Sequence, residues 1–154
     1  MEFSHFDETG RARMVDIGSK PLTFRRAVAE GVVRAAAATL SAVREKRTPK
    51  GDPLEIARLA GIQAAKRTAE LIPLCHPLML DHVEIVITLE HEAFRIRSEV
   101  KCRSATGVEM EALVAVTVAA LTVYDMCKGV DSGMVIGDVR LVHKEKSASG
   151  LQSD

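Results

Sequence analysis

The longest run of uncharged, mostly apolar residues covers thirteen positions, 112–124, inside a segment, 108–128, that is rich in helix-forming residues. Thirteen residues are too few to cross a bilayer, which needs about 20. A helix that is apolar on all sides has to be buried, either by its own chain or by a partner copy. We therefore expect this helix at the centre of the fold or at an interface between copies.

Alternation of apolar and polar residues predicts four strands. Two of them, 83–89 and 94–102, follow each other closely enough to form a hairpin. Residues 22–34 form an extended segment, and residues 134–143 form the last strand. In this last strand the alternation changes parity at Gly137, which predicts a bulge there.

Two further helices precede the hairpin. Strong helix formers predict one over 35–47. Apolar residues at steps of three and four predict another that begins at Pro53, after an N-cap at Asp52, and ends before Pro73. The resulting order β, α, α, β, β, α, β indicates an α+β domain with helices packed on one face of an antiparallel sheet.

Length and composition limit the class of protein. The chain of 154 residues is the size of one domain, and 21 basic and 21 acidic residues give no net charge. We predict one catalytic domain over 14–144, between flexible segments at 1–13 and 145–154. Zero net charge and 3% aromatic residues argue against nucleic acid and membrane surfaces as partners.

Cysteine usage and the N-terminus bear on the compartment. Three cysteines without a Cys-x-x-Cys motif indicate neither a disulfide framework nor a zinc cluster. Residues 1–13 carry five charges and no apolar run, unlike a signal peptide. These features predict a cytoplasmic protein.

Residues 71–78 read LIPLCHPL, with two prolines flanking Leu74, Cys75 and His76. Each proline fixes its own backbone and pushes the preceding residue toward extended geometry, so His76 lies on a stiff segment. A fixed imidazole can bind a substrate or transfer a proton, whereas the alternative is a rigid loop whose histidine bonds to backbone. Nothing nearby indicates a lowered pKa for Cys75.

Two glutamates open the apolar helix. Thr106 and Glu109 have the spacing of a capping box, which explains Glu109 structurally. Glu111 stands at the head of the uncharged run, where a buried carboxylate is costly unless it is paired or used. It is therefore a candidate for function.

The same helix ends with Asp125 and Lys128, three residues apart and on one face. If partly desolvated, such a pair could shift both pKa values toward neutrality and act as acid and base; the alternative is a solvated helix end. Glu111 and Asp125 are 14 residues apart, which is about 21 Å along a helix. Either two sites exist, or opposite ends of the helix from different subunits build one site, and we favour the second.

Three lysines could hold phosphate groups or could simply be solvated. Lys50 precedes a helix N-terminus, where anions are favoured. Lys144 and Lys146 lie at the end of the last strand. Neither a P-loop nor a dinucleotide-binding motif is present in the sequence.

Several motifs together resemble the MoaC family, the cyclic pyranopterin monophosphate synthases of molybdenum cofactor biosynthesis. The matching segments are 14–16, 50–52, 60–66, 71–78, 106–113 and 118–128. The proline-flanked Leu-Cys-His and the run GVEMEA at 107–112 carry most of the specificity.

This resemblance implies a ferredoxin-like α+β fold in a homohexamer, a trimer of dimers with active sites at the dimer interface. It implies conversion of (8S)-3′,8-cyclo-7,8-dihydroguanosine 5′-triphosphate to cyclic pyranopterin monophosphate and diphosphate, with no cofactor and no protein-bound metal. By motif, Asp125 and Lys128 would be the acid/base pair. The implied substrate-binding residues are Lys50, Leu74, Cys75, His76, Met110, Glu111 and Lys144.

Arg25 also matches a family arginine. One departure is the tail: the family usually continues after the Lys144 position with a glycine-rich segment, whereas residues 145–150 here read EKSASG. A function from another class is a catalytically idle assembly module that binds nucleotides or RNA, although zero net charge and scarce aromatics disfavour RNA.

Overall fold

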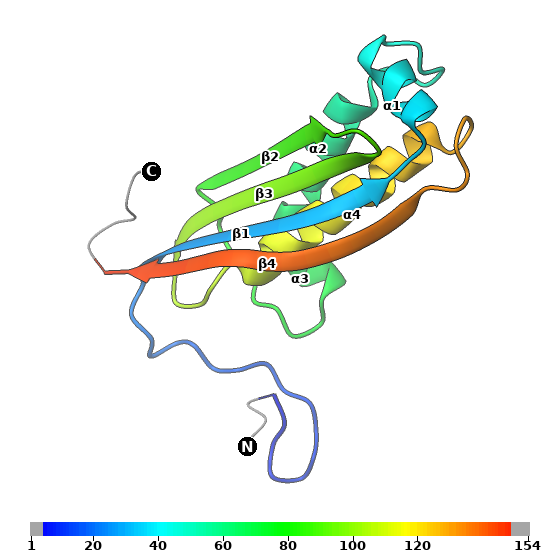
Figure 1. The fold of residues 1–154 in the computed structure, drawn as a ribbon. Helices are drawn as coiled ribbons and strands as arrows, with labels where there is room; N and C mark the ends of the chain where they lie inside the picture. Colours follow the sequence, from blue (N-terminus) through cyan, green and yellow to red (C-terminus); the bar gives the residue numbers. More distant parts are fainter. Residues whose placement is uncertain (1–4, 149–154) are drawn as a thin grey trace.

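A computed structural model gives the fold, and it describes residues 5–148. Four strands form one sheet in the order β2-β3-β1-β4, with every neighbouring pair antiparallel. The strands are β1 (Thr23–Arg34), β2 (His82–Leu89), β3 (Ala93–Ser104) and β4 (Val135–Ser147). The helices are α1 (Ala37–Arg44), α2 (Pro53–Lys66), α3 (Thr68–Leu71) and α4 (Glu109–Cys127). The predicted α+β, ferredoxin-like class with helices on one face of the sheet is confirmed (Figure 1).

The apolar helix α4 is the centre of the packing. It lies against β1 and β3 on one side and against α2 on the other. Two glycines allow close approach: a Cβ on Gly31 would lie 2.6 Å from the side chain of Val116, and one on Gly61 would lie 3.0 Å from the Ala115 carbonyl oxygen. The hydroxyl of Ser98, buried on β3, donates to the carbonyl of Ala112 (2.8 Å) and ties the first turn of α4 to the sheet.

By length and composition alone, α4 could also cross a membrane. Its 19 residues have high mean hydropathy, but 56% of the most apolar stretch is buried within the described fold. That burial is typical of the core helix of a soluble protein.

Helix α2 begins as predicted and breaks earlier than predicted. The carboxylate of Asp52 accepts from the backbone N–H of Leu54 (2.9 Å), and Pro53 is the first helical residue. The backbone leaves helical geometry at Arg67, and the hydroxyl of Thr68 donates to the Ala65 carbonyl there (3.0 Å). The predicted single helix is therefore α2 followed by the short α3.

The bulge predicted in β4 is present next to Gly137. Opposite β1, the register shifts between Glu30 and Val32, and Asp138 has a positive φ of 53°. Strand β4 runs to Ser147, three residues past the predicted domain limit at 144. Residues 149 and 150 of the departing tail lie outside the described residues.

Candidate active site

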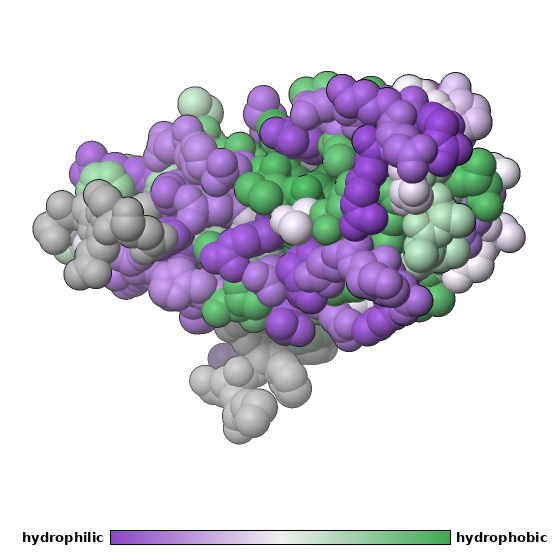
Figure 2. Space-filling model, turned by 45° about the horizontal axis from the view of Figure 1, so that its top comes forward, coloured by the Kyte–Doolittle hydropathy of each residue, from purple (hydrophilic) through white to green (hydrophobic). Residues whose placement is uncertain are grey.

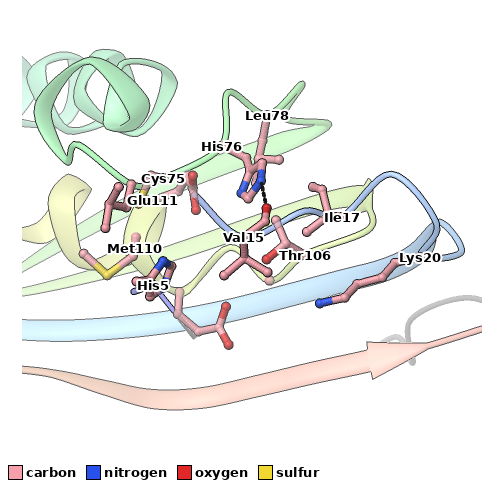
Figure 3. A pocket seen from close by; sticks show the side chains of 13 residues that line it. His5, Val15, Ile17, Lys20, Cys75, His76, Leu78, Thr106, Met110 and Glu111 are labelled. Carbon is pink, nitrogen blue, oxygen red and sulfur yellow. Dashed lines mark hydrogen bonds between the residues drawn. The ribbon is translucent and has the colours of Figure 1, made fainter. Parts of the chain in front are cut away.

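A cavity of about 440 Å³ lies at the N-terminal end of α4 and is named here the His76 pocket (Figure 3). It forms where the first turn of α4, the segment between α3 and β2, and the N-terminal segment meet. Its lining residues are His5, Val15, Ile17, Lys20, Leu74, Cys75, His76, Leu78, Thr106, Gly107, Glu109, Met110 and Glu111.

His76 is held in place by the N-terminal segment. Its Nε2 lies 2.7 Å from the carbonyl oxygen of Val15, drawn as a dashed line in Figure 3. Because a carbonyl only accepts, Nε2 carries the proton of this hydrogen bond. The alternative in which the histidine bonds to backbone is thus correct, and the same ring also faces the cavity.

Glu111 is the buried acid of this pocket. Only 4% of the residue is exposed. Burial, and secondarily the charge of Glu109, raises the pKa of the Glu111 carboxyl above its ordinary value. Burial also raises the pKa of the neighbouring Cys75 thiol, and the charge of Glu111 adds to that shift. Burial at this end of α4 therefore disfavours the charged form of both groups.

A second cavity, of about 310 Å³, adjoins the first and is named here the basic pocket. The two cavities share Gly107 and Glu109 in their walls. The residues that line the basic pocket are Arg25, Arg26, Gly107, Glu109, Lys144, Glu145 and Lys146. Arg25 is anchored there, because its guanidinium donates to the Ala105 carbonyl (3.2 Å).

The opposite end of α4 carries the Asp125 cluster, made of Lys50, Asp125 and Lys128. The Nζ of Lys128 lies 2.7 Å from Asp125 Oδ1, and the Nζ of Lys50 lies 3.3 Å from Oδ2. All three side chains are about half exposed. Hydrogen bonds from Lys128 and then Lys50 lower the pKa of Asp125, and the hydrogen bond to Asp125 raises the pKa of Lys128.

The sequence of residues 14–147 matches the MoaC family. The chain belongs to this family. Proteins named cyclic pyranopterin monophosphate synthase are 54% identical to it in Parvibaculum lavamentivorans and 56% identical in Heliobacterium modesticaldum and Thermomicrobium roseum. These matches cover 96–97% of this chain and 91–94% of the relatives. Family membership makes the chain an enzyme, a lyase of molybdenum cofactor biosynthesis.

In this MoaC-family chain the predicted site residues fall into two groups. The structure brings Leu74, Cys75, His76, Met110 and Glu111 together around one cavity. Lys144 lies in the adjoining basic pocket. Lys50, Asp125 and Lys128 meet at the far end of α4, so one chain does not bring them to the cavity.

One expectation about these residues is wrong, and the condition of another is not met within one chain. The capping box does not form: Val108 is the N-cap of α4, no side chain caps it, and Glu109 instead pairs with Lys144 (Nζ to Oε1, 3.4 Å). Within one chain, the pKa values of Asp125 and Lys128 move away from neutrality, because both groups are too exposed for desolvation to oppose their mutual attraction.

The sequence reasoning missed the contribution of the N-terminal segment. His5, Val15, Ile17 and Lys20 line the His76 pocket, although no local pattern marks them. The Nδ1 of His5 is buried without a hydrogen-bond partner among the described residues. The family match at residues 14–16 was the one signal for this segment. Among residues 5–148, no group of three or more His, Cys, Asp and Glu side chains is placed to hold a metal ion.

Proposed function

We propose that this chain converts (8S)-3′,8-cyclo-7,8-dihydroguanosine 5′-triphosphate to cyclic pyranopterin monophosphate and diphosphate by acid/base catalysis. The family and the names of its relatives support this reaction. In the proposal the His76 pocket takes the ring system, the basic pocket takes phosphates, and Asp125 with Lys128 transfers protons.

One observation supports this arrangement above the others: the two groups of site residues lie at opposite ends of one straight helix. Glu111 and Asp125 are separated by 14 residues, about 21 Å of helix. A substrate of this size does not reach both ends within one chain. The Asp125 cluster of one chain therefore serves the His76 pocket of a partner copy.

The chemistry of each part fits this division. Ring opening and ring closure require protons to move, and a carboxylate beside an ammonium group supplies a base and an acid. Closing the cyclic phosphate forms one P–O bond to a sugar oxygen and breaks another to the departing diphosphate. Cations stabilise the charge that develops on that leaving group, which is the role proposed for Lys144 and, from the partner copy, Lys50.

An assembly of copies is supported by the surface. Figure 2 shows apolar residues exposed among polar ones. Large apolar side chains that are exposed on α2 and α4 include Ile56, Leu59 and Leu121. Burying them against a second copy would also desolvate nearby charged groups, among them the Asp125 cluster, and would change its pKa values from those of the single chain. We propose a homohexamer, a trimer of dimers with active sites at the dimer interface.

A cytoplasmic location is part of the same proposal. The three cysteines, Cys75, Cys102 and Cys127, are free. Free thiols fit a reducing compartment.

The test is complementation between inactive variants. Glu111→Gln removes one half of the site and Asp125→Ala removes the other. If copies share sites, random co-assembly of the two variants leaves half of the sites in mixed dimers intact, and recovers about a quarter of wild-type diphosphate release. Diphosphate release from the cyclised triphosphate is the measurement.

The matched control mixes chains that carry Asp125→Ala with chains that carry Lys128→Ala. Both changes lie at the same end of α4. Because every site then lacks one member of the pair, no activity returns. Mixed Glu111→Gln and Asp125→Ala chains that stay as inactive as each variant alone would disprove a shared site. A wild-type protein that releases no diphosphate would disprove the reaction itself.

A further inference from the structure

We infer that Glu109 is a positioning residue: its carboxylate pairs with Lys144 between the two pockets, and a phosphate group competes with it for that lysine. The inference rests on the proposed function, because it assigns phosphates to the basic pocket. It concerns a residue that sequence reasoning had explained as a helix cap.

The side chain of Glu109 lies between the two cavities. It lies in the wall of both cavities, the His76 pocket and the basic pocket. Its Oε1 lies 3.4 Å from the Nζ of Lys144, and 32% of its side chain is exposed. A ligand that spans both cavities must pass this carboxylate.

The surroundings of Glu109 are mainly basic. Four of the side chains lining the basic pocket are basic and two are acidic, Glu109 and Glu145. In the β1–β4 register, Lys146 lies opposite Arg25, and Lys144 lies opposite Ala27. These β1 positions have the same parity as Gly31, which faces Val116 of α4. The three cations therefore lie on the face of the sheet that carries α4. Glu109 is the first residue of α4, where the helix dipole also favours anions.

The Glu109 carboxylate lies against Gly107, in the space that a Cβ at this position would take. A Cβ added at Gly107 would overlap the carboxylate and lie 2.6 Å from Glu109 Cδ. The atoms in conflict are the end of a flexible side chain, so Gly107→Ala displaces the carboxylate without straining the backbone. Position 107 thus offers a way to move the charge without removing it.

Glu109 therefore competes with phosphate groups for Lys144. Its single negative charge pairs with Lys144, and a di- or triphosphate, with more charge and more oxygen acceptors, competes for the same ammonium group. Because Glu109 is partly exposed, its carboxylate can turn toward solvent when displaced, and no buried charge is left unpaired.

The experiment measures binding of inorganic pyrophosphate to the full chain by calorimetry. Glu109→Gln should bind pyrophosphate about tenfold more tightly than wild type, because a repelling and competing charge is removed. A purely structural role for Glu109 predicts equal or weaker binding. Either of those results overturns the inference.

Three further variants sharpen the test. Gly107→Ala should also tighten binding, and an unchanged affinity would overturn the placement of the carboxylate. In a Lys144→Gln background, Glu109→Gln should raise the affinity for pyrophosphate markedly less. An equal rise in affinity would show that the ion pair between Glu109 and Lys144 does not affect pyrophosphate binding. Glu92→Gln, the same charge change on the exposed turn between β2 and β3, should bind as wild type does.

Failure of the proposed function gives a different pattern. If the wild-type protein does not turn over the cyclised triphosphate but the pyrophosphate series behaves as expected, the reaction is wrong and the role of Glu109 stands. If turnover is normal and Glu109→Gln gains no affinity, the role of Glu109 is wrong and the reaction stands.

Discussion

The two ends of α4 hold acidic residues in opposite surroundings. Glu111, in the first turn, is 4% exposed, and burial raises its pKa. Asp125, in the last turn, has a side chain that is 56% exposed, and hydrogen bonds from Lys128 and Lys50 lower its pKa. One helix therefore presents a carboxyl group that resists ionisation and another that resists protonation.

The difference shows what a single chain already provides and what it lacks. The Glu111 end is a formed cavity whose character is set by this fold alone. The Asp125 end is an exposed ion pair, which in water contributes little to stability. Within the part of one chain that the structure describes, nothing encloses this pair so that it could act on a substrate. In our proposal, a second copy supplies the enclosure that turns this pair into an acid and a base.

The largest expected effect is at the exposed end. Asp125→Asn and Lys128→Met should each lower turnover by about a thousandfold, the size of an acid/base contribution. Both variants should still fold, because neither side chain packs in the core of the single chain. Steady-state diphosphate release and thermal unfolding are the two measurements.

A matched control exists on α2. Glu55 and Arg58 form another exposed i, i+3 pair, 3.1 Å apart. Glu55→Gln makes the same isosteric change and should keep full turnover. If Asp125→Asn is no more harmful than Glu55→Gln, the Asp125 pair is an ordinary surface pair.

The fold was largely predictable because its strongest pattern is local. The all-apolar run predicted the helix 108–128, and α4 spans Glu109–Cys127. Asp52 and Pro53 fixed the start of α2 in the same way. The break at Arg67 was missed, since the apolar periodicity continues through it and only the backbone and the Thr68 hydroxyl show it.

The resemblance named several residues that the structure places around one cavity, and these are residues that are close in sequence. Leu74, Cys75 and His76 share one stiff segment, and Met110 and Glu111 share one helical turn. The pairing of Glu109 with Lys144 joins residues 35 positions apart, and the sequence offered Glu109 a local explanation that tertiary structure replaced. The carbonyl of Val15 could not be predicted as the partner of His76, because backbone groups carry no sequence signal.

A smaller effect should appear in the pH dependence of stability. The folded pKa of Glu111 lies above the ordinary value of a glutamate carboxyl, so the folded state holds this proton more tightly than the unfolded state. Its favourable contribution is full below that ordinary pKa and is lost as pH rises through the raised value. Glu111→Gln should remove this loss of stability and lower turnover by about a hundredfold.

Urea unfolding at a series of pH values measures this effect, and Glu99→Gln is the control with the opposite sign. Burial raises the pKa of Glu99, but hydrogen bonds from Lys101 and Arg26 together outweigh it, and the net shift is downward. Glu99 therefore contributes stability above the ordinary carboxyl pKa and loses it as pH falls. If the free energy of unfolding changes with pH in the same way for wild type and for Glu111→Gln, the pKa of Glu111 is not raised.

The smallest effect tests whether Glu111 influences its neighbour. Cys75 is the one partly exposed cysteine, whereas Cys102 and Cys127 are buried, with the pKa of Cys102 raised to about 11. Iodoacetamide should therefore label Cys75 alone, and more slowly than free cysteine, because burial and then Glu111 raise the pKa of the thiol. Glu111→Gln should speed labelling, because it removes the charge that adds to the raised pKa of this thiol. Mass spectrometry of the labelled peptides measures this rate, and an unchanged rate would mean that burial alone sets the reactivity of Cys75.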